Sequence, residues 1–279
     1  MYRLVASDMD ETFLGEHHRI PEANLEALRR MREAGVLFVP SSGRPYPSIM
    51  GNFADIDQSL MEGTYVISYN GGFINRYGDP KPLFTTHIDH EVADELYRRG
   101  IELGLVQHLY GTEGRTLVID TDADERAYVS SLPGIEFFSS EGHPDVASYF
   151  GDGEVVKSIY ASTDFAMLHE LGERLRPALA EKGVDVTYSS GRYLEFVEKG
   201  VNKGLGLTRL AGLLGIPVSE TVGVGDSAND LAMIEVAGLG VGVANVTDDV
   251  RPHCDLVLDT PAKDGAFGEL FERVIKPSL

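Results

Sequence analysis

Two acids two residues apart follow a short apolar run near the start of the chain. The stretch "DMDETFL" carries Asp8 and Asp10 directly after "YRLVAS". In an extended chain, side chains two positions apart point to the same side. Carboxylates held this close repel each other and raise each other's pKa unless a cation lies between them. The pair indicates either a cation site or two solvated acids in a loop, and this stretch alone leaves both open.

Two further stretches place anion-binding groups after apolar runs. "FVPSSGRP" offers the hydroxyl of Ser42, the flexible backbone of Gly43 and the guanidinium of Arg44, which suit phosphate oxygens. "EKGVNKGLGL" opens a predicted helix with Lys203, where an ammonium and free backbone N–H groups would bind an anion. A plain turn and a solvated helix start are the alternative interpretations.

A fourth stretch, "TVGVGDSANDLAMI", places more acids at a strand end. Asp226 follows the glycine-rich strand, and Asn229 and Asp230 fall in the first turn of the next helix. Asp226 and Asp230 are thus one helical turn apart. Acids at the start of a helix are also common as caps, so this stretch too has a purely structural interpretation.

The same stretch fits the dinucleotide fingerprint G-x-G-x-x-G/A through Gly223, Gly225 and Ala228. In such a site the pyrophosphate occupies the helix N-terminus. Here Asp226 and Asp230 would repel that anion. The fingerprint also normally follows the first strand of its βαβ unit. Both arguments disfavour a nucleotide site.

Apolar, β-rich runs alternate with amphipathic helical patterns in the first and last thirds of the chain. The predicted strands are "YRLVAS", "VLFVP", "TYVIS", "TVGVG", "GLGVGV" and "DLVL". Helices are predicted at about 21–33 and 203–214, and after Pro45, Ser227 and Gly265. This pattern predicts an α/β fold with a doubly wound, mostly parallel sheet. Ligands of such sheets bind outside the carboxyl ends of the strands, where all four stretches would meet.

The pattern changes between residues 83 and 190. Helical patterns near 91–103, 124–131 and 165–182 are separated by shorter β-rich runs. We expect an α+β cap domain at 83–190, inserted into a discontinuous core domain formed by 1–82 and 191–279.

Composition limits the class of protein. The formal net charge of -20 argues against binding to nucleic acid or to an anionic membrane surface. No apolar run approaches the roughly 18 residues that span a bilayer, and Asp8 and Asp10 interrupt any signal peptide. Cys254 is the single cysteine, which excludes an intrachain disulfide and fits a reducing compartment. We therefore expect a cytoplasmic protein and make no prediction of its oligomeric state.

Taken together, the four stretches resemble the haloacid dehalogenase superfamily, and in particular its Cof-type sugar-phosphate phosphatases. Asp8, Asp10 and Thr12 match the first motif, Ser42 the second and Lys203 the third, while "GDSAND" matches the fourth. "SYNGG", "GRP" and "YLEFVEKGVNKG" are similar to that branch in particular. The resemblance covers essentially the whole chain and places the α/β cap between the second and third motifs.

The resemblance implies a mechanism with an aspartyl-phosphate intermediate. Asp8 would be the nucleophile, and Asp10 would protonate the leaving group and then activate water. Mg²⁺ would be held by Asp8, the backbone carbonyl of Asp10 and Asp226. Asp230 and Asn229 would fix Asp226, and Asn229 could also touch substrate.

The remaining phosphoryl oxygens would be bound by Lys203 and Ser42, with Gly43 beside them. Arg44 and Asn70 could each contact substrate or be structural. Glu195 is expected to pair with a core cation, and the cap candidates for substrate selection are His108, Tyr110, Arg115 and Tyr188.

One residue departs from the branch. Glu11 stands where glycine is common, and its carboxylate either points outward without effect or narrows the range of substrates. We favour the first interpretation.

The implied activity is hydrolysis of a small phosphate monoester, with a sugar phosphate favoured. A phosphomutase or phosphoryl transferase would carry the same motifs and differ in the acceptor of the phosphoryl group. A non-catalytic, phosphometabolite-binding protein would be expected to lack a nucleophile or metal ligand, and none is missing from this sequence.

Overall fold

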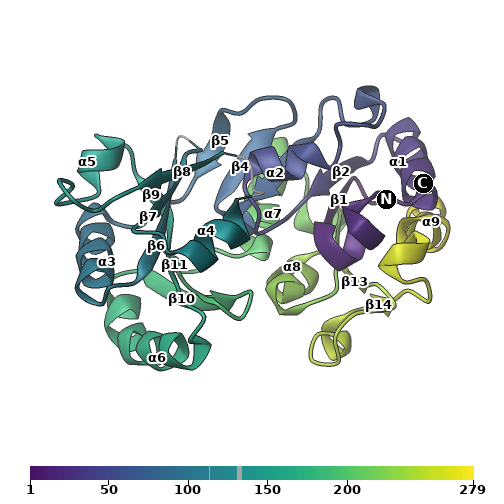
Figure 1. Ribbon diagram of the computed structural model, residues 1–279. Helices are drawn as coiled ribbons and strands as arrows, with labels where there is room; N and C mark the ends of the chain where they lie inside the picture. Colours follow the sequence, from purple (N-terminus) through teal and green to yellow (C-terminus); the bar gives the residue numbers. More distant parts are fainter. Residues whose placement is uncertain (113, 131–133) are drawn as a thin grey trace. The chain divides into compact units, whose positions relative to one another are not determined.

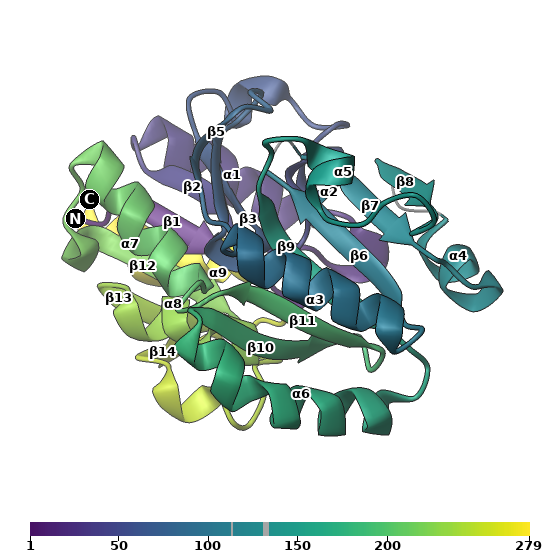
Figure 2. The ribbon, with the colours of Figure 1, turned by 90° about the vertical axis from the view of Figure 1, so that its left-hand side faces the viewer.

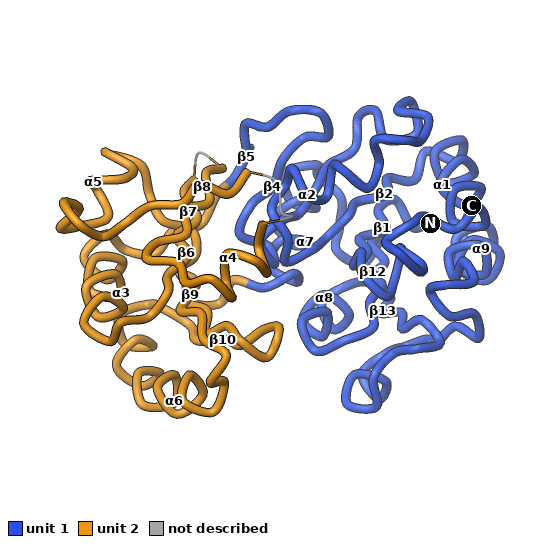
Figure 3. Tube along the Cα trace, viewed as in Figure 1, with its two compact units in different colours: residues 1–84, 202–279 blue, residues 85–201 orange. Residues whose placement is uncertain are grey.

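The computed structural model describes residues 1–112, 114–130 and 134–279, and these divide into two compact units (Figure 3). Unit 1 comprises residues 1–84 and 202–279, and unit 2 comprises residues 85–201. The predicted boundary after residue 190 differs from this division. Strand β11 (Tyr193–Glu198) pairs with β9 and β10 of unit 2, so the chain leaves unit 2 only after this strand.

Unit 1 is built on a parallel sheet (Figure 1). Its strand order is β14-β13-β12-β1-β2, and each described neighbouring pair is parallel. The strands are β1 (Leu4–Ser7), β2 (Leu37–Pro40), β12 (Thr221–Gly225), β13 (Leu239–Gly242) and β14 (Leu256–Val257). In register, Leu4 lies opposite Leu37 on one side and Thr221 on the other. The carboxyl ends of β1, β2 and β12 therefore lie side by side.

Helices cover both faces of this sheet, which confirms the predicted doubly wound α/β fold. The helices of unit 1 are α1 (Glu22–Glu33), α2 (Tyr46–Gly51), α7 (Lys203–Leu214), α8 (Leu231–Val236), α9 (Ala266–Leu270) and α10 (Lys276–Ser278). Val5 of β1 packs in a cluster with α1 and α9, whereas its neighbours Leu4 and Ala6 pack in a cluster with α7 and α8. This alternation is expected of a strand buried on both faces.

Strand β3 (Tyr65–Ser68) is less closely tied to the parallel sheet than the sequence predicts. It pairs antiparallel with β4 (Phe73–Arg76), in a separate sheet of order β3-β4-β5 that also includes β5 (Pro82–Thr85). It contacts the end of β2 through an isolated parallel bridge between Ser41 and Ile67. The bridge keeps the end of β3 beside the end of β2.

Glycines on β12 allow α8 to pack closely against the sheet. A Cβ atom on Gly223 would lie 2.6 Å from the carbonyl oxygen of Met233 in α8. A Cβ atom on Gly225 would lie 2.3 Å from Cβ of Asp230. The glycines that fit a dinucleotide fingerprint thus have a packing role here.

Unit 2 is an α+β structure. Its strand order is β10-β11-β9-β6-β7-β8, antiparallel apart from the parallel pair β7·β8. Besides β11, the strands are β6 (Val106–Gly111), β7 (Thr116–Ile119), β8 (Ile135–Phe138), β9 (Val155–Ala161) and β10 (Val184–Ser189). The helices are α3 (His90–Glu102), α4 (Ala123–Val129), α5 (Ala147–Phe150) and α6 (Phe165–Glu181). The helix predicted at 124–131 corresponds to α4, and residue 131 lies outside the described residues.

Helices α3 and α6 lie on one face of the unit 2 sheet (Figure 2). Leu96 of α3 and Leu171 of α6 belong to one apolar cluster with Tyr160, Leu194 and Phe196 of the central strands. Strands β6 and β8 were not predicted. In β6 the buried polar residues Gln107 and His108 interrupt the apolar pattern on which a strand prediction depends.

Among the described residues, no helix combines the length and apolar character that crossing a bilayer requires.

Candidate active site

The carboxyl ends of β1 and β12 bring Asp8 and Asp226 together. Asp8 directly follows β1, and its backbone N–H donates to the carbonyl oxygen of Val224 in β12 at 2.9 Å. Asp226 directly follows β12. Although 218 positions separate them in the sequence, parallel pairing places both acids at the same sheet edge.

Lys203 begins α7 and is completely buried. The side chain of Asn202 accepts a hydrogen bond from the backbone N–H of Leu205 at 2.9 Å, which fixes the start of this helix. The Lys203 ammonium contacts Asp8 Oδ1 and lies 2.6 Å from Asp230 Oδ1. The third predicted stretch is thus held between acids of the first and fourth.

Asp230 uses both of its oxygens within the protein. Oδ1 bonds Lys203, and Oδ2 accepts from the backbone N–H groups of Asp226 at 3.0 Å and Ser227 at 3.1 Å. Ser227 and Asp230 form a capping box at the start of this helical segment. Asp230 therefore orients the Asp226 backbone and the Lys203 ammonium.

Asp226 is held from two further directions. The Thr12 hydroxyl donates to Asp226 Oδ1 at 2.6 Å, and the backbone N–H of Thr247 donates to the Asp226 carbonyl oxygen at 2.8 Å. Thr12 matches the first motif, but its bond to Asp226 has no signal in local sequence spacing because the residues lie on different strand ends.

Ligand atoms of Asp8, Asp226 and Asp230 all lie within 4.8 Å of one another. Burial raises the pKa of Asp8 to about 7, Lys203 opposes the shift, and Asp230 and Asp226 add to it. Burial also raises the pKa of Asp226 to about 6, against the hydrogen bond from Thr12. For Lys203, burial alone would lower the pKa, but Asp8 and Asp230 raise it to about 12. The ammonium is therefore charged, and the carboxylates exceed it in number.

The donor set fits a hard divalent cation. In the described part of the chain, no hydrogen bond reaches the second carboxylate oxygen of Asp8 or of Asp226. These oxygens belong to buried acids whose mutual repulsion a cation would relieve. Asp230 is a poorer ligand because both its oxygens are already engaged.

The ends of β2 and β3 supply the polar groups beside this centre. Ser42 is buried, and its carbonyl oxygen accepts from the backbone N–H of Asn70 at 2.9 Å. The Asn229 side chain donates to Asn70 Oδ1 at 3.5 Å. A Cβ atom on Gly43 would lie 3.1 Å from the Asn70 side-chain amide, a tight contact that Asn70 would have to relieve by shifting a few tenths of an ångström. The structure thus brings Ser42, Gly43, Asn70 and Asn229 together.

Asp10 and Arg44 lie together rather than with Lys203. Arg44 Nε is 3.1 Å from Asp10 Oδ2, and the Arg44 backbone N–H donates to Ser42 Oγ at 3.2 Å. Asp10 is partly exposed, in contrast to Asp8. Three further residues contact this neighbourhood: His18 contacts Asp10, Asn52 accepts from Arg44, and Asn245 donates to the Glu11 carbonyl. No motif or spacing in the sequence indicates these contacts.

Comparison with known proteins identifies the family. Residues 5–270 match the haloacid dehalogenase-like hydrolases. The chain belongs to this family. The resemblance predicted from the motifs is thereby confirmed.

Several relatives of this hydrolase are named phosphatases. It is 28% identical to the 5-amino-6-(5-phospho-D-ribitylamino)uracil phosphatase YcsE of Bacillus subtilis, over 94% of this chain and 92% of the relative. A haloacid dehalogenase-like hydrolase from Bacteroides thetaiotaomicron superposes with a TM-score of 0.81 at 25% identity, covering 98% of this chain and 100% of the other. The subclass IIB sugar phosphatase BT4131 superposes with a TM-score of 0.78 at 21% identity, covering 97% and 98%. The family and the named relatives identify this haloacid dehalogenase-like hydrolase as a phosphatase.

The departure at Glu11 has a backbone cost. Glu11 has φ 59° and ψ 10°, in the left-handed region that glycine enters without steric penalty. The side chain is exposed, and the Asn245 amide donates to the Glu11 carbonyl oxygen at 2.8 Å. The glycine that is common here in this branch of the hydrolases suits this turn, and Glu11 keeps the turn at the expense of strain.

The predicted cap candidates of this hydrolase have partners inside unit 2. His108 is buried, with Nε2 3.0 Å from Glu125. Arg115 forms two bonds of 2.9 Å to Glu136, and the Tyr188 hydroxyl donates to Glu173 at 3.0 Å. Tyr110 lies beneath the ammonium of Lys157, at 5.4 Å. Glu195, expected to pair with a core cation, pairs at 2.7 Å with Lys157.

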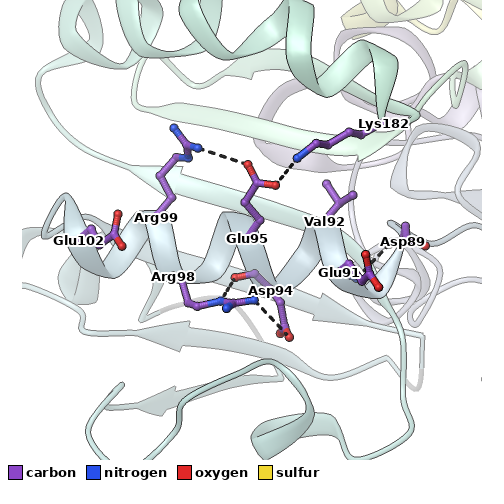
Figure 4. Close-up of a pocket in the computed structure, with 9 residues that line it drawn as sticks. All are labelled: Asp89, Glu91, Val92, Asp94, Glu95, Arg98, Arg99, Glu102 and Lys182. Carbon is purple, nitrogen blue, oxygen red and sulfur yellow. Dashed lines mark hydrogen bonds and ion pairs between the residues drawn. The ribbon is translucent and has the colours of Figure 1, made fainter.

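A hollow of about 790 Å³ runs along α3 of unit 2 (Figure 4). Glu95 pairs with Arg99 at 3.3 Å and with Lys182, and Arg98 lies 3.8 Å from Asp94. An anionic substrate would find no unpaired cation among its described lining residues. The hollow contains none of the predicted site residues, so the carboxylate cluster of unit 1 remains the candidate active site.

We predict that Glu11→Gly stabilises the protein. Relief of the left-handed strain, about 1–2 kcal/mol, should exceed the cost of added chain entropy, leaving a gain of up to about 1 kcal/mol. Urea unfolding checks this. Glu16→Gly is the matched control, because Glu16 is an exposed acid on the same loop that lacks a positive φ, and it should lose stability. A loss of stability in Glu11→Gly equal to that of the control would contradict the strain assignment.

We also predict that divalent cation affinity rises with pH between about 5.5 and 8. Protons occupying Asp8, with a pKa of about 7, and Asp226, with a pKa of about 6, must leave before a cation binds. Between pH 7.5 and 5.5 the affinity should fall roughly 100-fold if both acids ionise on binding. Calorimetric titration in buffers of different ionisation enthalpy measures the protons released. An affinity that does not change over this range would contradict this electrostatic account.

Proposed function

We propose that this protein is a Mg²⁺-dependent phosphatase that hydrolyses a small phosphate monoester, with a sugar phosphate favoured, through an aspartyl phosphate on Asp8. The observation that carries the proposal is the state of Asp8. Lys203 holds one of its oxygens, and the other oxygen makes no hydrogen bond with the described residues. A nucleophile needs such a free oxygen, and a nearby ammonium to accommodate the incoming phosphoryl charge.

In the proposed reaction the free oxygen of Asp8 attacks phosphorus. The bond between phosphorus and the ester oxygen breaks, and that oxygen takes a proton from the Asp10 carboxyl as the alcohol leaves. Asp10, now a carboxylate, takes a proton from the water that attacks the aspartyl phosphate. The bond between phosphorus and the Asp8 oxygen then breaks, the water oxygen leaves as part of inorganic phosphate, and Asp8 and Asp10 return to their starting states.

The other residues bind and orient. Lys203 would face the phosphoryl oxygens with a charge that Asp8 and Asp230 maintain against the effect of burial. Ser42 and Gly43, at the end of β2, are proposed to donate to the same oxygens, and Asn70 and Asn229 to contact the phosphoryl group or the rest of the substrate. Because phosphoryl transfer depends chiefly on positioning and charge stabilisation, such a set can suffice with one metal ion.

Mg²⁺ would be held by Asp8, the backbone carbonyl of Asp10 and Asp226, with Asp230 orienting Asp226. When bound, it would neutralise the acids and withdraw charge from the phosphoryl oxygens. The preference for Mg²⁺ rests on the all-oxygen donor set, since hard cations select carboxylates and carbonyls.

Two relatives support the substrate class. One is named for a phosphorylated ribitylamino pyrimidine, and another is named a sugar phosphatase. Both names describe a small, polar organic phosphate. A cytoplasmic location is part of the proposal and is supported by the single cysteine, Cys254.

We predict that Asp8→Asn abolishes turnover while the protein still folds. The substitution removes the nucleophile with little change in volume, so kcat should fall by at least about 10⁴-fold. The measurement is the rate at which inorganic phosphate is released from each ester in a panel of phosphate esters. Asp55→Asn, a change at an exposed acid of unit 1, is the control and should retain activity.

Full Mg²⁺-dependent hydrolysis by Asp8→Asn would disprove the mechanism. Transfer of the phosphoryl group to a sugar hydroxyl, without release of phosphate, would instead identify a mutase or transferase on the same site.

A further inference from the structure

Both carboxylate oxygens of Asp10 are held by side chains from other segments. His18 Nδ1 lies 2.9 Å from Asp10 Oδ1, and Arg44 Nε lies 3.1 Å from Asp10 Oδ2. Arg44 Nε is shielded from solvent and makes no hydrogen bond of good geometry, so its contact with Asp10 is an ion pair. The carboxylate is thus contacted from two sides.

Asn52 closes these contacts into a ring. Its side-chain oxygen accepts from Arg44 Nη2 at 2.9 Å, and its side-chain nitrogen donates to the His18 carbonyl oxygen at 3.1 Å. We call Asp10, Arg44, Asn52 and His18 the Asp10 ring. Each member contacts the next, although they come from three separate segments of unit 1.

Helix α2 sets the geometry of the ring. Arg44 precedes the helix and Asn52 follows its last residue, Gly51. Tyr46 and Ile49 of the helix are buried, which anchors it against the core of unit 1. The Arg44 side chain therefore reaches along a fixed helix to Asn52.

The loop that carries His18 is held in an unfavourable conformation. His18 has φ 55°, in the left-handed region that residues with a Cβ rarely adopt. Such strain persists where surrounding contacts determine the conformation. Here the Asn52 amide bonds the His18 carbonyl, and the Gly15 backbone N–H donates to the Arg19 carbonyl oxygen at 2.8 Å.

Arg44 and Lys203 contact different acids. Lys203 contacts Asp8, the proposed nucleophile, whereas Arg44 uses Nε on Asp10 and Nη2 on Asn52. The planar guanidinium can hold two partners in a fixed relation, which an ammonium cannot do. The side chain of Arg44 is thereby directed to the proposed acid and base.

We infer that Arg44 and Asn52 are positioning residues that hold the Asp10 carboxyl in place for proton transfer. The inference rests on the proposed function of Asp10. It gives Arg44 a role other than phosphate binding, and it gives Asn52, a residue outside the motifs, a part in the reaction. Loss of this positioning should affect some substrates more than others. A misplaced acid slows departure of a poor leaving group more than departure of a good one.

The test compares two esters in Asn52→Ala and Arg44→Ala. An alkyl phosphate needs a proton on its leaving oxygen, whereas p-nitrophenyl phosphate releases a stable anion. We expect kcat for the alkyl ester to fall about 10-fold in Asn52→Ala and about 100-fold in Arg44→Ala, with KM nearly unchanged. The loss for p-nitrophenyl phosphate should be several-fold smaller. The double variant should lose less than the product of the two single losses, because Asn52 acts in part through Arg44 and in part through its bond to the His18 carbonyl.

Two conservative variants separate positioning from simple structural support. Asn52→Asp keeps an acceptor for Arg44 but loses the amide that donates to the His18 carbonyl, so it should recover part of the alkyl ester activity lost in Asn52→Ala. Arg44→Lys keeps the charge without the planar fork and should remain impaired. Arg32→Ala, which removes an arginine that bonds Glu62 instead, is the matched control and should retain wild-type rates on both esters.

Equal losses on both esters, a rise in KM alone, or rescue by Arg44→Lys would overturn the positioning role. Additive losses in the double variant would also overturn it. Asp10→Asn distinguishes this failure from failure of the proposed function. If Asp10→Asn keeps full activity, the proposed role of Asp10 is wrong; if it loses activity while Asn52→Ala and Arg44→Ala do not, only the ring assignment is wrong.

Discussion

The site depends on one electrostatic constraint, which is the burial of more negative than positive charge at the end of a parallel sheet. Asp8, Asp226 and Asp230 bring ligand atoms within 4.8 Å of one another, beside the ammonium of Lys203. Burying a charge is costly unless it is paired. Burial raises the pKa of Asp8 to about 7 and that of Asp226 to about 6, so the acids bind protons near neutral pH when no metal ion competes. A divalent cation would complete the charge balance, because its charge and that of Lys203 together match the three carboxylates.

Much of unit 1 serves to impose this crowding. Parallel pairing of β1 and β12 puts Asp8 beside the end of β12, which Asp226 directly follows. The capping box at Ser227 and Asp230 fixes the next turn, and the absence of a side chain at Gly225 lets Asp230 lie against the strand. Gly225 and Asp230 thus belong to the same packing arrangement. Strain at Glu11 is tolerated because the turn must return the chain to place Thr12 against Asp226.

The sequence was sufficient to predict the family and the parallel sheet but not the contacts that orient the site residues. Helix α7 was predicted at its observed bounds, because Asn202 and Gly215 are strong local signals for its two ends. Asp8 and Asp226 were found because each directly follows an apolar strand. The ring through Asn52 could not be found, since its contacts join segments whose proximity exists only in the fold. Strand β6 was missed because its buried polar residues break the apolar pattern, and the boundary after residue 190 was placed early because the pairing of β11 is likewise nonlocal.

The central claim is that Asp8 forms a covalent intermediate in a cation-dependent site. Acid quench during turnover, followed by borohydride reduction and peptide mapping, tests it most directly, because reduction converts an aspartyl phosphate to homoserine. The account predicts homoserine at position 8 only when substrate and Mg²⁺ are both present. Modification at Asp10 or Asp226 instead, or steady turnover with no modification at position 8 in any quenched sample, would contradict it.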